Sequence, residues 1–495
     1  MAPHIPSSKI TVSCPLFGAD FDPQNNGRLL VGGGGGEGRS GVGNKIFLLN
    51  TAHPDRTAEL VDITLSRDED SVMSLGIAQS SHDSLVAFAG INSSQAEQRQ
   101  NNNQHLRSFK VKYPKQGDQK SPPNTEQSSQ STPLSRISLF RTTAVKGKED
   151  QEAYQRILRL SPWRGDSPRI AAIATGLAPQ GEIVLFNANT LTPQESDVLG
   201  RVSLGNQEEA EDLDLSDTGS DGNFNFIYTN GSSLHMCEVL LKTKTKSLEF
   251  RSVYTVPPES GKKPKIRAVR FLTPTSVALL INSPNRSGCE LAVLSLKDSP
   301  PLIKRRRRLH GSMKIGVGLD VCHLSRSSTN EQQHVFAVSG NNQSIELFTI
   351  DYSPDRGYGK IYHYVTLRNL HPFSMTKIVF SNFIHPSHPD AAKVPPQYIK
   401  LASVSVGNTA VVHTLPLSPY PADSKRPRYV LVIPGPSEIL QNLFSIIMAI
   451  IVIALGAFLL QAYTELQGDV PPILGVKEWL PKLMPRNYFD NAWEL

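Results

Sequence analysis

Short β-type segments recur along most of the chain, and this recurrence is the feature that most restricts its fold. Between residues 8 and 418, runs of β-branched and aromatic residues are separated by Gly, Asn, Asp and Ser, and no long amphipathic helix pattern stands between them. The runs fall into about seven groups with a spacing of roughly 45–65 residues, which is typical of a repeat architecture. The pattern therefore predicts an all-β chain built from repeated sheets.

Each group follows the same order of segments. A first strand is followed by a second strand that ends in small residues, then by a turn such as 340–342 or 407–409, and then by an outgoing strand. This order predicts a seven-bladed WD-type β-propeller over residues 1–420, although the Trp-Asp dipeptide is absent. A stack of β-sandwiches is the alternative, but it leaves the isolated strand at Ile10–Val12 without a partner. In a propeller that strand completes the last blade beside Thr409–Leu415 and closes the ring.

The C-terminal part of the chain carries a membrane signal. No charged residue lies between Ile439 and Thr464, and Leu443–Leu460 is almost wholly apolar. A helix needs roughly 20 apolar residues to cross a bilayer, so the sequence predicts a single transmembrane helix at 439–463. A juxtamembrane linker would then occupy 421–438, and a short luminal tail 464–495.

The charges around this span predict its orientation. Lys425, Arg426 and Arg428 precede the span, whereas Glu465 and Asp469 follow it. The positive-inside rule therefore places the propeller in the cytosol. No apolar segment typical of a signal peptide follows the first residue, which agrees with a single-pass type II membrane protein.

Composition excludes several function classes and predicts two disordered insertions. The formal net charge is only +6, which does not indicate a nucleic-acid-binding surface. The four cysteines are far apart and form no CxxC pair, so neither a disulfide framework nor a zinc module is expected. The segments near 92–104 and 112–135 are rich in Gln, Asn, Ser, Lys and Pro and are expected to be disordered loops on the blades.

The basic run Lys304–Arg308 permits three interpretations. It resembles a nuclear-import or nucleic-acid patch, it suits a solvated loop between blades, and beside a membrane it would attract anionic headgroups. The solvated loop is the interpretation that we favour from the sequence, and a membrane span argues against a nuclear role.

A glycine-rich segment at 32–44 is the most unusual feature of the first predicted blade. Eight of the twelve residues from Gly32 to Gly43 are glycine, and strand-like runs flank the segment on both sides. A dinucleotide-binding loop would need a helix after it, and a phosphate-binding P-loop would need Gly-Lys-Ser/Thr, so neither interpretation fits. No catalytic signature appears elsewhere, and a propeller hydrolase would need carboxylates converging on the central channel, for which the sequence shows no pattern. We therefore expect no enzyme active site.

Such a loop offers mainly its backbone to a ligand. Free carbonyl oxygens can replace the water shell of a hard cation, as they do in potassium filters. A bound cation would make the loop rigid and present Val42 and Asn44 to a partner protein. This hypothesis rests on the glycine composition alone.

The motif Gly-Gly-Gly-Gly-Glu-Gly-x-x-Gly-Val-x-Asn-Lys at 33–45, together with a degenerate propeller and a C-terminal span, resembles one family. It is the endoplasmic-reticulum exchange factor for the Sar GTPase, which starts COPII coat assembly. The resemblance implies a guanine-nucleotide exchange factor in the endoplasmic reticulum membrane that promotes GDP release from a Sar-type small GTPase. A membrane-anchored propeller scaffold without exchange activity is the alternative.

The same resemblance assigns roles to single residues of the loop. It implies that Asn44 and Val42 act on the GTPase, and that Arg39 and Ser40 have no assigned role. It also implies backbone carbonyl ligands for a potassium ion and further contacts with the partner. The potassium ligands would be Gly33, Gly34, Gly35, Gly36 and Gly38, and the partner contacts would be Gly38, Gly41, Gly43 and Lys45.

Overall fold

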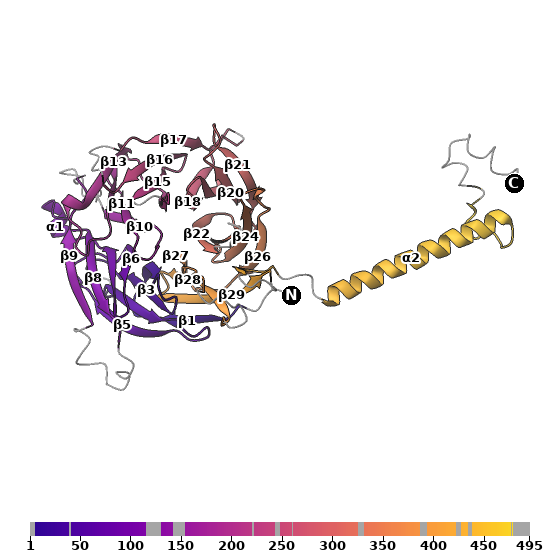
Figure 1. Cartoon of the computed structure of the whole chain (residues 1–495), viewed down its shortest axis with the longest axis horizontal. Coiled ribbons are helices and arrows are strands. Elements are labelled where there is room, and N and C mark those ends of the chain that lie inside the picture. The colour runs from indigo at the N-terminus through magenta and orange to yellow at the C-terminus, as the bar shows by residue number, and fades with distance from the viewer. Residues whose placement is uncertain are drawn as a thin grey trace. The chain divides into compact units, whose positions relative to one another are not determined.

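The structure is a computed structural model that describes residues 5–38, 41–114, 130–141, 154–219, 222–242, 248–259, 261–324, 331–386, 394–421, 427–433, 438–476 and 478. These residues form seven antiparallel sheets of four or five strands, arranged as blades around a central channel (Figure 1). The predicted seven-bladed propeller is therefore confirmed.

Each blade contains four main strands, which follow one another in order from the channel to the rim, and two blades have a short fifth strand. The strands nearest the channel are β2 (Leu16–Phe21), β6 (Ser74–Ser80), β10 (Tyr154–Leu160), β14 (Asp212–Asp217), β18 (Lys265–Thr273), β22 (Gly316–Leu324) and β27 (Met375–Phe380). The second strands are β3 (Arg28–Gly33), β7 (Ser84–Gly90), β11 (Ile170–Gly176), β15 (Asn223–Thr229), β19 (Ser276–Asn282), β23 (Gln332–Gly340) and β28 (Gln397–Ser405). The third strands are β4 (Lys45–Asn50), β8 (Leu106–Lys112), β12 (Gln180–Asn187), β16 (Ser233–Leu240), β20 (Cys289–Ser295), β24 (Ile345–Ser353) and β29 (Thr409–Tyr420). The outer strands are β5 (Ala58–Thr64), β9 (Ser131–Ile137), β13 (Val198–Asn206), β17 (Arg251–Thr255), β21 (Leu302–Arg308), β26 (Tyr362–Leu367) and β1 (Ser7–Thr11).

The ring is closed by β1, which comes from the N-terminal end of the propeller. This strand pairs antiparallel with β29 of the last blade, with Ser7 opposite His413 and Thr11 opposite Thr409. Closure by the isolated N-terminal strand was predicted from the sequence and is confirmed, and the sandwich alternative is wrong. One buried core cluster contains Phe47 of the first blade and Val412 of the last, so side-chain packing continues across the closure.

Acidic residues of the inner strands link three of the blades to the blade that follows. The carboxylate of Asp20 accepts the Ile77 N–H at 2.8 Å, Asp214 accepts the Phe271 N–H at 2.7 Å, and Asp320 accepts the Phe380 N–H at 2.7 Å. Burial raises the pKa of Asp20 to about 6. Carboxylates do converge on the channel, contrary to the expectation from the sequence, but these three already bind backbone amides. They therefore have a structural role between blades.

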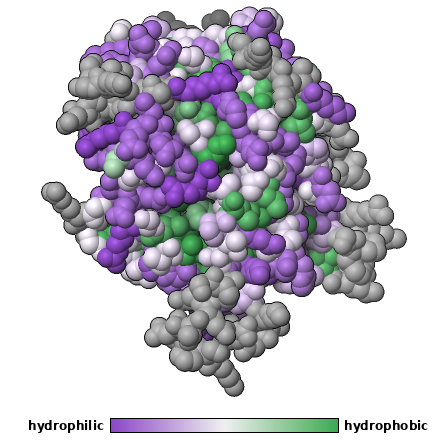
Figure 2. Space-filling view, turned by 90° about the vertical axis from the view of Figure 1, so that its left-hand side faces the viewer, coloured by the Kyte–Doolittle hydropathy of each residue, from purple (hydrophilic) through white to green (hydrophobic). Residues whose placement is uncertain are grey.

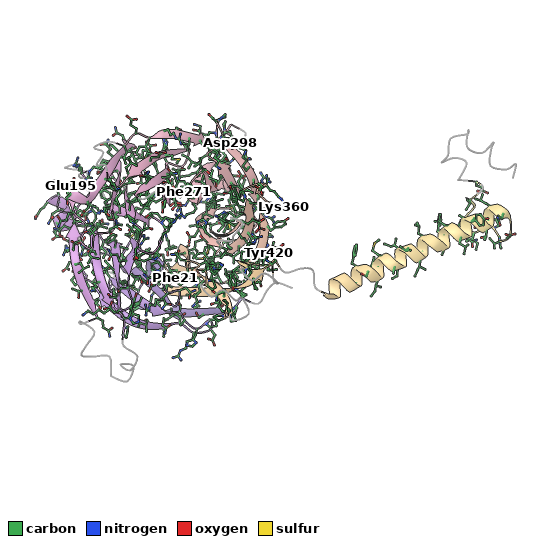
Figure 3. All side chains as sticks on the ribbon, in the orientation of Figure 1. Phe21, Glu195, Phe271, Asp298, Lys360 and Tyr420 are labelled. Atoms are coloured by element: carbon green, nitrogen blue, oxygen red, sulfur yellow. The ribbon has the colours of Figure 1, made fainter. Side chains whose placement is uncertain are left out.

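The channel forms a cavity with a volume of about 1200 Å³. Arg159, Arg270 and Lys377 line it together with the inner-strand acids, and Phe21 and Phe271 mark its wall in Figure 3. Arg159 lies 3.5 Å from Asp214, and Arg270 lies 3.5 Å from Asp320. Opposite charges therefore balance one another inside the ring.

Two expectations about segment boundaries are wrong. The basic run Lys304–Arg308 is not a loop, because it belongs to the outer strand β21, which pairs with β20. The propeller also extends beyond residue 420, since the short strand β30 (Arg428–Val430) pairs with the end of β29, and the compact unit ends at Ile433. The linker at 421–438 is therefore shorter than predicted. A further two-residue strand, β25 (Gly357–Tyr358), pairs with β24.

The segment 92–104 also differs from the sequence prediction, because it is folded. It contains the short helix α1 (Gln95–Arg99), whose first turn is capped by the Ser94 side chain. Its ends are held by side-chain hydrogen bonds, since the Asn103 amide donates to Asn92 Oδ1 at 3.2 Å. Of the second predicted insertion, residues 115–129 lie outside the described residues, and Ser131–Ile137 forms β9.

A second unit follows the propeller and contains the helix α2 (Glu438–Gln467). Within the described residues it is the one helix long and apolar enough to cross a membrane, over Leu443–Gln467. This agrees with the transmembrane helix predicted at 439–463. Most of the predicted tail lies outside the described residues.

A buried histidine supports the folded segment 92–104. Nε2 of His105 accepts the N–H groups of Leu139 at 3.0 Å and Phe140 at 3.2 Å, so the proton is on Nδ1, which donates to Gln155 Oε1 at 2.8 Å. Burial lowers the pKa of His105 to about 4. Protonation would break both backbone hydrogen bonds, so the fold requires the neutral ring.

Because of this histidine, the free energy of unfolding of the propeller should decrease at acidic pH. The unfolded chain takes up a proton near pH 6.5 whereas folded His105 does so near pH 4, so stability should fall as the pH decreases between these values. The contribution of this group is about 3 kcal/mol. Urea unfolding of the detergent-solubilised full chain at several pH values checks this. The variant H105Q should reduce the pH dependence only by the share of this one group, because burial also lowers the pKa of His323, His334, His371 and His413. H53Q, at an exposed histidine, should leave the slope unchanged, and equal slopes for all three proteins would contradict the assignment.

Candidate functional site

The glycine loop connects β3 to β4 and lies at one face of the propeller. In antiparallel blades the loops between second and third strands share a face with the connections from one blade to the next. The segment 65–73, which connects β5 to β6, is therefore a neighbour of the glycine loop, and the N–H of Gly38 donates to the Arg67 carbonyl at 3.3 Å. We call this side of the ring the glycine-loop face.

Asn44 anchors the loop from the inside. Its side chain is fully buried, and Oδ1 accepts the Gly36 N–H at 3.1 Å. Nδ2 donates to the carbonyls of Ser66 at 3.0 Å and Glu69 at 2.7 Å. One amide therefore fastens the glycine loop to the connection between the first two blades. This position differs from the expectation that Asn44 is presented to a partner, because two backbone carbonyls of the neighbouring segment satisfy its donors.

Two of the glycines are required by close packing, one against Asn44 and the other against the backbone of Pro15. A side chain at Gly33 would place its Cβ 1.8 Å from the Pro15 carbonyl oxygen, and one at Gly34 would place it 2.0 Å from Asn44 Oδ1. Gly34 also has a φ of +153°, which side chains rarely adopt. The backbone conformation of the first part of the loop is therefore determined by packing.

The tip of the loop is open to solvent. Gly38 and Gly41 are exposed with positive φ values of 92° and 72°, whereas Gly43 is half-buried. Val42 is half-buried and packs against the core cluster shared by the first and last blades. Residues 39 and 40 lie outside the described residues. The exposed glycines therefore lie where a partner can reach their backbone.

Lys45 has a local partner that the sequence did not reveal. It begins β4, its Nζ lies 2.6 Å from Asp62 Oδ2, and it also lies 5.7 Å from the centroid of the Phe47 ring. To bind a partner protein as predicted, the Lys45 side chain would have to give up this ion pair inside the first blade.

The loop also contacts α1, which sequence reasoning missed. The Glu37 carboxylate accepts the N–H of Gln95 at 2.7 Å, which links the tip to the second blade. The side of the ring that carries α1, β8 and β9 is shown in Figure 2, where hydrophilic residues alternate with hydrophobic patches. The composition of residues 92–104 could not reveal this contact, because the acceptor lies 58 residues earlier in the chain.

The described part of the loop offers oxygen atoms to a cation. No described residue donates a hydrogen bond to the carbonyls of Gly34, Gly35 or Gly36. The carboxylate of Asp70 is close, since a Cβ at Gly36 would lie 3.3 Å from Asp70 Oδ1. Carbonyl and carboxylate oxygens are the ligands that hard cations prefer. The donor set therefore fits a hard cation such as potassium, with Asp70 as a ligand not predicted from the sequence.

An exposed aromatic side chain lies on the same face in the last blade. Phe373, in the connection from β26 to β27, is 61% exposed, and Val406 in the turn from β28 to β29 is also exposed. The last blade is adjacent to the first, because the Thr376 hydroxyl donates to the Leu16 carbonyl at 2.7 Å. The glycine loop and this apolar patch therefore occupy neighbouring blades.

The anchor predicts the effect of the variant N44A. It removes three hydrogen bonds and leaves the carbonyl of buried Glu69, and that of Ser66, without these donors, so the free energy of unfolding should fall by about 2–4 kcal/mol. Hydrogen exchange of the amides at 34–38 should become faster in the full chain. N50A, at a half-buried surface amide, serves as the control and should change stability by less than about 0.5 kcal/mol. Unchanged exchange at 34–38 in N44A would contradict the anchoring role.

Comparisons with known proteins identify one curated protein and several solved structures that are similar to this chain. Over 374 residues the chain is 23% identical to the guanine nucleotide-exchange factor SEC12 of Candida glabrata, a match that covers 75% of this chain and 67% of that protein. No protein-family model matches the chain. A solved structure described as "COPII on membranes, outer coat vertex" matches with a TM-score of 0.48 and 13% identity, over 87% of this chain and 91% of that one. The crystal structure of Sqt1 from Chaetomium thermophilum matches with a TM-score of 0.42 and 11% identity, over 81% of this chain and 95% of that one. In agreement with the resemblance suggested by the glycine motif, the chain is similar to the SEC12 guanine nucleotide-exchange factor.

Proposed function

We propose that this protein is a guanine-nucleotide exchange factor that promotes GDP release from a Sar-type small GTPase at the endoplasmic reticulum membrane and so starts COPII vesicle formation. The observation that carries the proposal is the glycine loop, which is anchored at its base and exposed at its tip, in a chain similar to SEC12. Exchange needs neither a general acid nor a nucleophile, so the proposal requires no catalytic centre in the channel.

The physical mechanism is differential binding. The glycine-loop face would bind the nucleotide-free GTPase more tightly than its GDP-bound form, so each ligand lowers the affinity for the other. Every tenfold loss of GDP affinity needs about 1.4 kcal/mol of such preference. A rigid binding surface favours this difference, because less conformational entropy is lost when the partner binds. The three hydrogen bonds of Asn44 supply that rigidity at the base of the loop.

A potassium ion would extend the rigidity to the tip. The carbonyls of Gly33, Gly34, Gly35, Gly36 and Gly38 are the proposed ligands from the loop, and Asp70 would add a negative charge beside Gly36. The ion would neutralise the repulsion among converging carbonyl dipoles. Gly41, Gly43 and Val42 would then meet the GTPase in one conformation. Asn44 would act through the loop that it holds.

The apolar patch of the last blade suits a second contact with the same partner. Phe373 and Val406 are exposed beside the loop, and large exposed aromatic residues are frequent anchors in protein interfaces. Contacts on two blades would orient the GTPase on the face. The helix α2 would hold the propeller on the cytosolic side of the bilayer, which raises the effective concentration of exchange factor at that membrane.

The proposal predicts potassium-dependent exchange. Full-length protein in phosphatidylcholine vesicles should accelerate fluorescent GDP release from a Sar-type GTPase by at least about tenfold, and replacing potassium by sodium should remove most of the acceleration. Release followed by stopped-flow fluorescence checks both statements. An absence of acceleration with stable GTPase binding would support the scaffold alternative, whereas equal rates in both salts would reject the potassium site but not exchange.

Phe373 allows a test of the second contact. F373A should lower the apparent second-order rate of exchange by about tenfold, which corresponds to about 1.4 kcal/mol of lost binding. Y398A is the matched control, because Tyr398 is 43% exposed at the opposite end of the same blade. Both variants should keep the wild-type melting temperature. Equal exchange rates for the two variants would exclude Phe373 from the interface.

A further inference from the structure

A basic pocket lies between the fifth and sixth blades, at the face opposite the glycine loop. Its volume is about 370 Å³, which falls within the range of small-molecule sites. It is formed by the connections from β20 to β21 and from β24 to β25, together with the turn between β18 and β19. Asp298, labelled on the rim of the ring in Figure 3, marks this region.

Positive charge dominates the lining of this basic pocket. Lys297, Lys304, Arg305 and Arg356 line it, with Asp355 as the only acidic lining residue. No described residue forms a hydrogen bond or ion pair with the side chain of Lys297 or Arg356, and both residues are exposed. Two cations therefore remain available to an anionic ligand without loss of an internal contact.

The other two cations are held in position by the fold. Arg305 donates from Nε to the Gly359 carbonyl at 2.7 Å, which links β21 to the sixth blade. Lys304 Nζ lies 3.1 Å from Oδ2 of Asp298, which is in the connection before β21. Strand β21, for which the sequence favours a loop, thus supplies two positioned cations to one concave site.

Hydroxyl groups complete the lining. The Tyr358 hydroxyl forms a hydrogen bond with Ser276, and Ser276 also bonds Thr273 at 2.7 Å. The rings of Tyr352 and Tyr358, which both line the pocket, pack against each other with their centroids 4.8 Å apart. Hydroxyls and cations together are the groups that bind phosphate oxygens by charge-assisted hydrogen bonds.

We propose that this pocket binds a small anion with several phosphate groups, of the inositol-phosphate class, either free in solution or as the headgroup of a phosphoinositide. Four cations around a pocket of headgroup size match several phosphates on a compact ring better than they match a single phosphate. Arg306 and Arg308 of β21 do not line the pocket, and they lie 3.4 Å from Glu290 and 3.8 Å from Glu259. The proposal does not depend on exchange activity, since the two sites lie on opposite faces.

The test uses the full-length chain in neutral phosphatidylcholine nanodiscs. Isothermal titration with inositol 1,4,5-trisphosphate should show one site, and inorganic phosphate should bind at least about tenfold more weakly. The double variant K297Q/R356Q should weaken trisphosphate binding by at least about tenfold, because two charge-assisted contacts are lost. The matched control R306Q/R308Q removes the same charge from the same rim and should change binding less than about threefold.

The outcomes separate the sources of the ligand and the competing explanations. If nanodiscs containing phosphatidylinositol bisphosphate reduce the apparent affinity for the soluble trisphosphate, the lipid headgroup reaches the pocket, and if they do not, the soluble anion is the ligand. Equal losses in the two double variants would show non-specific attraction to the basic rim and would overturn the proposal. A wild-type protein that binds no trisphosphate would overturn it as well. Melting temperatures equal to that of the wild type show that both variants are folded.

Discussion

The pairing of β1 with β29 is the constraint on which the rest of the structure depends. A single blade has two apolar faces and open strand edges, so blades are stable only when each is covered by its neighbours. The five residue pairs between Ser7–Thr11 and Thr409–His413 join the first and last blades and allow packing to continue around the ring. Closure also places loops that are far apart in the chain on one face. The Thr376–Leu16 hydrogen bond, for example, joins residues 360 positions apart.

The glycine loop shows how a rigid ring can carry an adaptable backbone surface. Its base is determined by Asn44 and by glycines that have no room for a side chain, whereas its tip has open space around Gly38 and Gly41. An all-glycine loop without an anchor would lose much conformational entropy on binding. A fully packed loop would expose no carbonyl oxygens to an ion or a partner. The arrangement at 34–44 combines an ordered base with accessible backbone, which is what a binding surface without side-chain chemistry requires.

The propeller could be predicted from local sequence because its buried strands are runs of adjacent apolar residues. Buried runs such as Leu85–Gly90 and Ile170–Gly176 are continuous apolar segments, so strands and their spacing were visible. Outer strands were missed where the residues face water on both sides, as in β21, whose basic residues hide its backbone pairing. The burial of Asn44 was missed for another reason. Its acceptors at Ser66 and Glu69 lie 22 and 25 residues away, and no periodicity connects them.

Whether a polar group already has an internal partner decides where a ligand can bind this chain. Along the channel the acids Asp20, Asp214 and Asp320 bind backbone amides of the following blades, so their charge serves the assembly of the ring. At the two faces, by contrast, some groups have no partner among the residues that the structure describes: carbonyls of Gly34, Gly35 and Gly36 on one side, and the side chains of Lys297 and Arg356 on the other. Groups that the fold has already satisfied contribute little to a ligand, because binding must first break their internal contacts. Unsatisfied groups avoid that cost, and those of both proposed sites lie in connections between strands.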